Sequence, residues 1–553
     1  MTTSTARTDI LSDGLGLDDL CFDDLFMRSL PGDDGPPTTP RQVHRAHWST
    51  ARATPVPAPT VAIWVPEVAT LLGWPSTLKA SSNTFAELLS GNRIAPGSRP
   101  FAMAYGGHQF GHWAGQLGDG RAMTLGEVVH AGQRWEVQLK GAGRTPYSRQ
   151  GDGRAVLRSS IRELLCSEAM HHLGVPTTRA LALTLTGDSV MRDMFYDGHP
   201  AREPGAIVTR VAPTFVRLGN FELFASRDDI SNIELLLNWV IRVHYPDISG
   251  SPPANTPEAA LVPTSKDQRA AFFVELCRRT ATTIAHWMAV GFVHGVMNTD
   301  NLSILGLTID YGPYGWLDHY DPAFTPNTTD YSHRRYAYAR QAGVGLWNLT
   351  RLGESLLSVL TEADLELGLE TYRTTVQATW SGLMSKKLGL DTPDDELFGD
   401  LLGLMARVET DWTLFFRSLP DVTSGVSPTD LALADRDPLR ALAQVFYAVP
   451  SDEVRVDFEG WLSRLAARVA AEGRDPELRR ASMNAVNPWF IPRNYLVHQA
   501  ISEATNGDFT AVQRLLEAAR SPFSEVTKDP ALAGKRPEWA RHQPGASALS
   551  CSS

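Results

Sequence analysis

Cysteine and long apolar runs are both scarce in this sequence. Only four of its 553 residues are cysteines, namely Cys21, Cys166, Cys277 and Cys551. So few thiols in so long a chain exclude a disulfide-rich scaffold and fit a reducing compartment. No apolar run approaches the roughly 20 residues of a membrane span, and the acidic N-terminus lacks the apolar core of a secretory signal. We therefore expect a cytoplasmic protein that does not act at a membrane.

Positive charge is also in short supply. Lys and Arg number 51 against 62 Asp and Glu, which gives a formal net charge of −11. This balance argues against nucleic acid as the main partner. What is present is an ordinary globular composition, with 43% apolar and 20% charged residues. Because 553 residues exceed what one compact core needs, we expect two or more lobes.

The hydrophobic patterns divide the chain into four parts. Residues 1–60 are rich in Pro and Gly and predict an N-terminal extended arm. Residues 61–222 predict a β-rich, nucleotide-binding N-lobe: strands at GDGRAMTLGEVV and RWEVQLK joined by a hairpin turn, one long helix at VLRSSIRELLCSEAMHHLG, and further strands at ALALTLTG, GAIVTRVA and FVRLG. Residues 223–520 predict a helical C-lobe that carries the catalytic loop, and residues 521–553 a flexible tail.

This order of elements is that of a protein kinase. The predicted class is therefore α+β, a protein-kinase-like two-lobed fold with N- and C-terminal extensions, on the strength of analogy until site residues agree with it. Within the helical lobe, the clearest helical patterns cover residues 271–290, 336–358, 400–417 and 457–471.

A lysine and a glutamate occupy the places of the kinase ion pair. In kinases, a strand lysine in a V-A-I-K context pairs with a helix glutamate. Here VQLK ends a predicted strand at Lys140, and Glu163 lies within the predicted helix. The ammonium could reach nucleotide phosphates as a point charge while the glutamate orients it. Either residue alone would more simply be a solvated surface charge. The interpretation of the two as a functional pair therefore depends on the kinase-like loop described next.

The stretch from His294 to Gly312 resembles the kinase catalytic loop and its metal site. HGVMNTDN matches H-R-D-x-x-x-x-N at His294 and Asn301, and Asp310 begins DYG where kinases have D-F-G. The apolar run LSILGLTI between them predicts a short hairpin that would bring an amide beside a carboxylate. Asn301 and Asp310 are therefore the candidate ligands of a divalent metal held against phosphate oxygens.

One position in this loop departs from kinases. Val296 stands where they carry the catalytic aspartate, and a valine cannot accept a proton from a substrate hydroxyl. Asp300 is the carboxylate within the loop that could serve as the base instead. A base in a different place suggests attack on a different phosphorus.

Glycine and arginine provide further candidate phosphate contacts. The run GGHQFGHWAGQLGDGR (106–121) could present backbone N–H groups to phosphates or could be a tight linker. His108 and His112 within it lack a third metal ligand nearby, so ordinary hydrogen bonding is the better prediction. Arg210 and Arg217 lie on or beside predicted strands, where their guanidinium forks would suit phosphate or simply face solvent. Asp152 and Gly153, in QGDGR, could contact a nucleotide or be structural.

These motifs resemble the selenoprotein O family of pseudokinase-fold proteins. The resemblance covers roughly residues 85–510 and rests on AYGGHQFGHWAGQLGDGRA, LKGAGRTPYSRQGDGRAVLRSSIRE, HGVMNTDN, DYGPYGWLD and MNAVNPWFIPRNYL. It implies an adenylyltransferase that binds ATP in a flipped orientation, transfers AMP to Ser, Thr or Tyr hydroxyls of proteins, and releases pyrophosphate. It also allows UMP transfer from UTP.

The resemblance implies a role for each matching residue. Asp300 would accept the proton, and Asn301 and Asp310 would bind Mg²⁺ or Mn²⁺. Lys140 and Glu163 would form the lysine–glutamate pair. The residues implied to contact ATP elsewhere are Gly118, Gly120 and Arg121 of the GDGR run, Asp152 and Gly153 of the flexible loop, and Arg210 and Arg217, which would hold a buried γ-phosphate.

One family feature is missing from this chain. Some bacterial members carry a cysteine in a Phe-Ile-Cys-Asn run that pairs with the C-terminal cysteine. Here the run reads Phe324-Thr325-Pro326-Asn327, so we do not expect a disulfide from this run to Cys551.

Two other functions remain open. A non-catalytic ATP-binding scaffold would also lack the kinase aspartate, and an ordinary kinase could use Asp300 as a displaced base.

Overall fold

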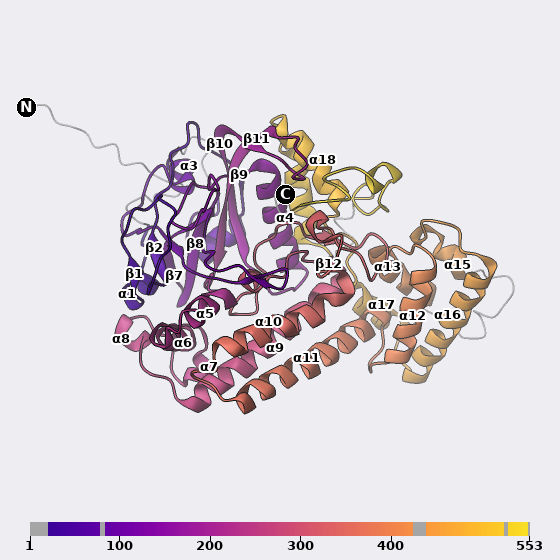
Figure 1. The fold of residues 1–553 in the computed structure, drawn as a ribbon. Coiled ribbons are helices and arrows are strands. Elements are labelled where there is room, and N and C mark those ends of the chain that lie inside the picture. Colours follow the sequence, from indigo (N-terminus) through magenta and orange to yellow (C-terminus); the bar gives the residue numbers. More distant parts are fainter. Residues whose placement is uncertain (1–19, 78–82, 424–437, 525–528, 551–553) are drawn as a thin grey trace, which may run out of the picture.

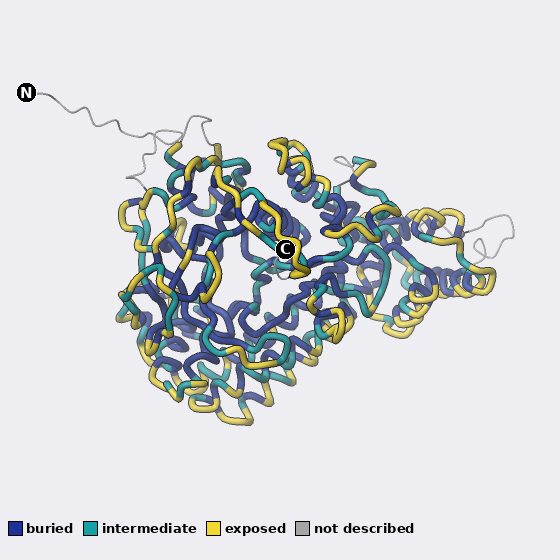
Figure 2. The backbone as a smooth tube through the Cα atoms, turned by 45° about the horizontal axis from the view of Figure 1, so that its top comes forward, coloured by how far each residue is buried: buried dark blue, intermediate teal, exposed yellow. Residues whose placement is uncertain are grey.

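The computed structural model describes residues 20–77, 83–423, 438–524 and 529–550. Figure 1 shows a β-rich part, whose large sheet is formed within residues 32–212, beside an elongated helical part. Figure 2 shows buried residues running through the interior of both parts and exposed residues gathered at the outer turns. The mixed α+β class predicted from the sequence is therefore confirmed.

A nine-stranded sheet, counted over the described residues, forms the β-rich part. Its strands run in the order β1-β2-β4-β7-β8-β11-β10-β3, and β9 pairs with β11. The strands of this sheet are β1 Gly32–Asp33, β2 Trp48–Thr50, β3 Thr60–Trp64, β4 Phe101–Met103, β7 Ala122–His130, β8 Gln133–Lys140, β9 Ala155–Val156, β10 Arg179–Arg192 and β11 Ala201–Ala212. Two small sheets pair β5 His108–Gln109 with β6 His112–Trp113, and β12 Phe292–Val293 with β13 Gly315–Trp316.

The predicted hairpin around HAGQ joins β7 to β8. His130 pairs with Gln133, so the turn consists of Ala131 and Gly132, both with positive φ (49° and 76°). Two positive φ angles define the turn type whose twist suits a tight antiparallel hairpin. This turn sets the register that carries Lys140 to the end of β8, opposite Ala122.

Helix α4 (Leu157–His172) is the long helix predicted beside the sheet. Its residues Ile161 and Leu165 are buried in the same core cluster as sheet residues such as Val208 and as Leu515 of the C-terminal helix α19. The helix therefore lies between the sheet and the last helices of the chain, α18 (Asn494–Thr505) and α19 (Thr510–Arg520), as Figure 1 shows. Burial on both sides fixes the position of Glu163.

The remaining helices build the elongated part and cover the sheet edges. Their bounds are α1 Leu25–Ser29, α2 Pro66–Leu71, α3 Asn83–Ser90, α5 Leu218–Ala225, α6 Ile230–His244, α7 Pro246–Ser249, α8 Pro257–Ala260, α9 Lys266–Val290, α10 Gln341–Ser355, α11 Glu362–Leu388, α12 Asp395–Arg407, α13 Trp412–Thr423, α15 Pro438–Ala441, α16 Asp452–Glu472 and α17 Pro476–Asn484. Helix α9 begins at a Ser265–Gln268 capping box and ends at Gly291, whose φ is 76°. Strand β12 and the catalytic loop follow at once.

Three local predictions differ from the structure. The strand predicted at FVRLG is wrong, because Leu218 begins α5 and the Asn220 side chain caps it by accepting a 2.8 Å hydrogen bond from Arg217 N. The single helix predicted over residues 400–417 is two helices, α12 and α13, separated at residues 408–411. The hairpin predicted at LSILGLTI is reduced to one antiparallel bridge, Leu302 to Thr308.

The two chain ends are more integrated than we predicted. Residues 20–60 are mostly irregular, but they supply β1 and β2 to the sheet and bury Phe26 in the core. In the tail, Leu549 is buried and its backbone pairs with Pro326 and Thr328 at 3.0 and 2.7 Å. Residues 1–19 and Cys551 lie outside the described part. None of the described helices is long and apolar enough to cross a membrane.

Candidate active site

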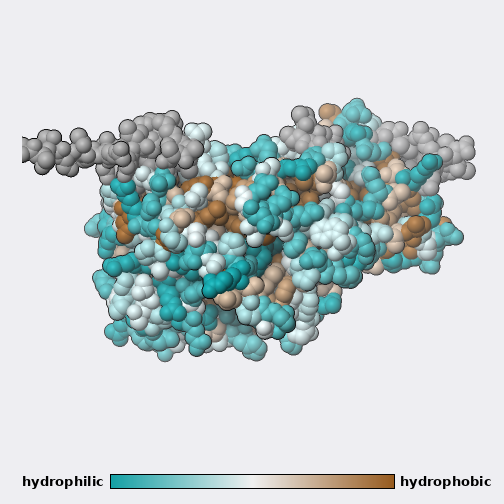
Figure 3. All heavy atoms as spheres, turned by 90° about the horizontal axis from the view of Figure 1, so that it is seen from above, coloured by the Kyte–Doolittle hydropathy of each residue, from teal (hydrophilic) through white to brown (hydrophobic). Residues whose placement is uncertain are grey.

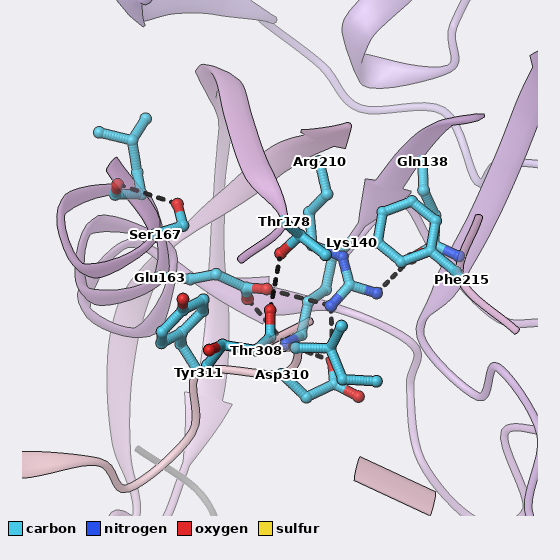
Figure 4. A network of polar contacts seen from close by, with 12 residues as sticks. Gln138, Lys140, Glu163, Ser167, Thr178, Arg210, Phe215, Thr308, Asp310 and Tyr311 are labelled. Atoms are coloured by element: carbon cyan, nitrogen blue, oxygen red, sulfur yellow. Dashed lines mark hydrogen bonds and ion pairs between the residues drawn. The ribbon is translucent and has the colours of Figure 1, made fainter. Parts of the chain in front are cut away.

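Lys140 and Glu163 form the buried ion pair predicted from the sequence. The Lys140 Nζ lies 2.7 Å from Glu163 Oε2, and Figure 4 shows the two side chains pointing toward each other from β8 and α4. Burial lowers the pKa of Lys140, against the opposing effect of Glu163 and Asp310. The ammonium is thus desolvated but kept in place by two carboxylates.

Three cations surround the carboxylate of Asp310. Its Oδ1 lies 2.5 Å from Arg210 Nη1 and 3.4 Å from Lys140 Nζ, and its Oδ2 lies 2.5 Å from Arg217 Nη1. Burial alone would raise the pKa of Asp310, but the charges of Arg217, Lys140 and Arg210 outweigh it and hold that pKa well below its usual range. Asp310 also has a positive φ of 58°, a backbone strain typical of functional sites.

Arg210 connects this cluster to the sheet, and Arg217 connects it to the catalytic loop. Arg210 Nη1 lies 3.0 Å from Glu163 Oε1, and its Nη2 donates to the side chain of Gln138 (Figure 4). Arg217 Nη1 donates to the backbone oxygen of Asp300 at 2.8 Å as well as to Asp310. One guanidinium therefore ties the two aspartates of the candidate site together.

The catalytic loop is buried and held by backbone contacts. His294 Nε2 lies 2.9 Å from the carbonyl oxygen of Ile309, so the start of the loop is bonded to the residue before Asp310. Val296 is buried, and its carbonyl oxygen accepts a 3.0 Å hydrogen bond from Asn301 Nδ2. This bond orients the amide of Asn301, whose side-chain oxygen accepts no hydrogen bond within the described residues.

Asn301 and Asp310 fit a divalent metal that shares its coordination with a nucleotide. An amide oxygen and a carboxylate are hard donors, and Mg²⁺ is commonly held by one or two protein oxygens together with phosphates. No group of three or more His, Cys, Asp or Glu side chains among the described residues could hold a metal by itself. The pair therefore suits an ion that arrives with phosphate ligands.

Asp300 has the environment of a general base. It stands in a single turn, Thr299–Asn301, and its Oδ2 accepts a 3.2 Å hydrogen bond from Gln109 Nε2, whereas its buried Oδ1 has no hydrogen-bond partner within the described residues. Burial raises the pKa of Asp300 to about 7, although Gln109 and Arg217 oppose the shift. A carboxyl group with such a pKa can accept a proton near neutral pH.

The GDGR residues lie at the edge of this site. Gly118 has a φ of 83°, and a Cβ there would meet the Tyr147 ring at 2.3 Å, so the loop can pack only with glycine. A Cβ at Gly120 would come within 2.9 Å of the Tyr147 backbone oxygen. Arg121 is close enough to Lys140 for its charge to oppose protonation of the ammonium. Arg121 thus connects the GDGR run to Lys140 at the end of β8.

Asp152 and Gly153 stand apart from the charged cluster. Both Asp152 carboxylate oxygens lie 2.8 Å from the guanidinium of Arg192 on β10. Gly153 has a φ of 71° and packs so tightly on Gly143 that a Cβ would come within 2.1 Å of its carbonyl oxygen. In this arrangement the two residues close their own loop, and their nucleotide contact stays a prediction.

For the glycine-rich run 106–121, the sequence left open phosphate contacts and a tight linker, and the start of the run has a further role. Its backbone N–H groups bond the catalytic loop: His108 N donates to Thr299 Oγ1 at 2.7 Å, and Phe110 N donates to Asn298 Oδ1 at 3.1 Å. His108 hydrogen-bonds Glu222 at 2.6 Å, so the expectation of ordinary hydrogen bonding rather than metal binding fits this residue.

Three site residues escaped the sequence analysis. Gln138 precedes Lys140 by two positions on β8, so the period of two of a strand could have placed both on one face. Asp119, inside the GDGR run, is buried and charge-coupled to Arg217 and Arg210. No sequence pattern could have identified Gln109, because it lies 191 residues from Asp300 in the chain.

A hollow of about 850 Å³ between β3, α3 and α19 contains none of the candidate residues.

Comparisons with known proteins agree with this geometry. The sequence model of the family described as protein adenylyltransferase SelO matches residues 39–520. Relatives called protein nucleotidyltransferase YdiU are 51% identical in Rhodopirellula baltica and in Azoarcus sp., and 50% identical in Xanthomonas campestris pv. campestris. Each alignment covers 97% of this chain and 99% of the relative. The chain therefore belongs to the SelO family of protein adenylyltransferases, enzymes of the nucleotidyltransferase class.

Proposed function

We propose that the protein transfers AMP from ATP to Ser, Thr or Tyr hydroxyls of other proteins and releases pyrophosphate. The observation that carries this proposal is the position of the candidate catalytic base in the loop from His294 to Gly312. Val296 occupies the position of the kinase base, while Asp300, four residues later, is buried with a pKa raised to about 7. A displaced base supports attack on the α-phosphorus rather than the γ-phosphorus.

The reaction follows from the placement of Asp300. The acceptor hydroxyl gives its proton to the Asp300 carboxylate as its oxygen forms a bond to the α-phosphorus. The bond between the α-phosphorus and the oxygen bridging to the β-phosphorus breaks, and its electron pair leaves with pyrophosphate. The Gln109 amide, 3.2 Å from Asp300 Oδ2, holds the carboxylate in one orientation throughout.

Lys140, Arg210 and Arg217 would bind the phosphates that leave. They gather three positive charges around Glu163 and Asp310, in a buried setting where charge interactions are strong. Arginine forks fit phosphate oxygens closely. Binding of the β- and γ-phosphates here would leave the α-phosphorus toward Asp300, which is the reversed orientation of ATP that the family resemblance implies. Gly118, Gly120, Arg121, Asp152 and Gly153 would complete the nucleotide site.

Asn301 and Asp310 would hold Mg²⁺ or Mn²⁺, whose charge would offset that of the phosphate oxygens. Asp310 stays ionised at any pH near neutrality because its pKa is held so low. For the architecture, we propose the kinase-like two-lobed arrangement: residues 61–222 as the N-lobe and 223–520 as the C-lobe. The strand–helix ion pair and the loop from His294 to Gly312 support it.

Two labelled forms of ATP separate this function from a kinase. With a mixture of unfolded proteins as acceptors, α-labelled ATP should label protein and γ-labelled ATP should not. Protein label from the γ position alone would establish a kinase that uses Asp300 as its base. Label from neither form, with ATP still bound, would establish the non-catalytic scaffold. Competition with UTP would rank UMP transfer against AMP transfer.

A further inference from the structure

The short hairpin formed by β5 and β6 lies directly over the proposed base. Its strands pair His108 with Trp113 and Gln109 with His112. On the inner side, a Cβ built at Gly107 would come within 2.7 Å of Asp300 Oδ1, and Gln109 donates to Asp300 Oδ2. The hairpin is also bonded to the catalytic loop through His108 N and Phe110 N. Whatever contacts the outer side of this hairpin is therefore close to Asp300.

The outer side carries aromatic rings. The His108 ring lies 5.2 Å from the Trp113 ring and 5.5 Å from the Trp347 ring of α10, measured between centroids. Trp113 is 40% exposed, which is unusual for so large an apolar side chain. His108 cannot turn away, because Glu222 holds its Nδ1 at 2.6 Å. The rings thus form an aromatic surface on the outer side of the hairpin, with His108 held in place at its centre.

Arginines border these rings. The Arg335 guanidinium lies 4.5 Å above the Trp347 ring, and it would be within 3.2 Å of a Cβ at Gly111, at the tip of the hairpin. Arg334 and Arg340 are exposed on the same segment, and none of these three arginines forms an ion pair within the described part of the chain. In a protein with a net charge of −11, three such arginines within seven residues are a marked local excess.

Nearby acidic groups are already engaged. The Asp330 carboxylate is buried and accepts hydrogen bonds from the backbone N–H groups of Arg335 and Tyr336 at 2.9 and 2.8 Å. Glu354 pairs with Arg351 at 2.5 Å, and Glu222 pairs with His108. The positive charge of Arg334, Arg335 and Arg340 is therefore left to face an external partner.

We propose that this docking platform (His108, Trp113, Arg335 and Trp347, with Arg334 and Arg340 at its margin) binds the acceptor polypeptide, and that it selects segments with acidic residues beside the acceptor hydroxyl. The inference rests on the proposed function, whose acceptor it specifies. Guanidinium forks bind carboxylates, and the rings pack against an extended chain. ATP has its own cations in Lys140, Arg210 and Arg217, so the platform is not needed for nucleotide phosphates.

Binding of two synthetic peptides tests the platform without relying on catalysis. One peptide has a serine flanked by glutamates, and the other has the same serine flanked by lysines, both with a fluorescent label for anisotropy. The full-length protein should bind the glutamate peptide about tenfold more tightly, which corresponds to about 1.4 kcal/mol, and less so at high salt. Arg335→Glu and Arg334→Glu should each abolish this preference. Arg202→Glu, an exposed arginine on β11, is the charge-matched control and should keep it.

The results of this experiment distinguish failure of the docking platform from failure of the proposed adenylyl transfer. Equal affinity for the two peptides, or an unchanged preference in both arginine variants, would overturn the platform. Displacement of the bound peptide by ATP would do so too, because it would assign these cations to the nucleotide. If the glutamate peptide binds as expected but takes no label from α-labelled ATP, the platform stands and adenylyl transfer to it fails.

Discussion

Asp300 and Asp310 are ten positions apart, yet their environments drive their pKa values in opposite directions. Burial dominates at Asp300 and raises its pKa to about 7. At Asp310 the charges of Arg217, Lys140 and Arg210 outweigh burial, and its pKa falls well below the usual range. Two carboxyl groups whose pKa values differ in this way can serve separately as proton acceptor and as permanent anion.

The raised pKa of Asp300 predicts a pH dependence. A general base must be deprotonated, so transfer of AMP should rise with pH and reach half of its maximum near pH 7. The measurement is kcat for α-label transfer between pH 5.5 and 8.5 at saturating ATP. A rate that stays flat across this window would show that Asp300 is not the base.

Gln109 should tune that midpoint. Its amide donates to the charged form of Asp300 and so opposes the effect of burial. Gln109→Ala should move the midpoint of the pH profile upward and lower kcat at pH 7 by several-fold, with a smaller loss at pH 8.5. Gln444→Ala, which removes an amide bonded to Ser418 far from the loop, is the matched control. An equal loss at every pH would indicate a role in folding rather than in orienting the base.

Among the secondary-structure elements, strand β8 and its neighbours show which site residues the sequence can predict and which it cannot. Glu136, Gln138 and Lys140 alternate along it and share one face. Lys140 was predictable from its motif, and Gln138 from the period of the strand. Arg217 was predicted as a candidate, but its contact with Asp310 was not, because that contact depends on the chain turning into α5 at this residue. The hairpin at residues 108–113 gave only a glycine signal, which fits a linker and a phosphate loop equally well.

Glu136 is the least expected member of that face. It is fully buried, accepts a 2.6 Å hydrogen bond from Thr214, and has its pKa raised to about 8 by burial and by the charge of Glu127. Because the folded state holds this proton more tightly than the unfolded state, its contribution to stability is present at low pH and is lost as pH rises toward 8.

Glu136→Gln should therefore change the pH dependence of unfolding. Relative to wild type, the free energy of unfolding of the variant should increase by about 4 kcal/mol between pH 5 and pH 8.5. Urea denaturation at the two pH values measures it. Glu366→Gln, an exposed position on α11, should run parallel to wild type. A parallel curve for Glu136→Gln as well would mean that this glutamate is ionised in the folded protein.

At the scale of the whole molecule, contacts between distant segments escaped the sequence. The tail composition predicted loose chain, but Arg541 binds Glu409 at 2.8 Å and Leu549 pairs beside Pro326. No local pattern reports such partners, because they lie more than a hundred residues away. The sequence also does not predict how surface residues group together. On the face in Figure 3 hydrophilic residues predominate, and apolar residues gather in patches.

Docking of the tail should depend on Leu549. Its side chain is fully buried, so Leu549→Asp would place an unpaired charge in an apolar site at a cost of several kcal/mol. We expect the segment after residue 529 to be cleaved at least tenfold faster in limited proteolysis. Leu478→Asp, at a leucine that is 68% exposed, should leave the cleavage pattern unchanged. Equal cleavage rates in wild type and Leu549→Asp would contradict a docked tail.

The proposed site should move a nucleotidyl group rather than a phosphoryl group. Intact-mass spectrometry of an acceptor protein after incubation with ATP and Mg²⁺ tests it most directly. We predict an added mass equal to AMP, released pyrophosphate in equal amount, and loss of both in Asp300→Asn by about 10²–10⁴-fold. An added mass equal to phosphate, or an undiminished AMP adduct in Asp300→Asn, would contradict the account.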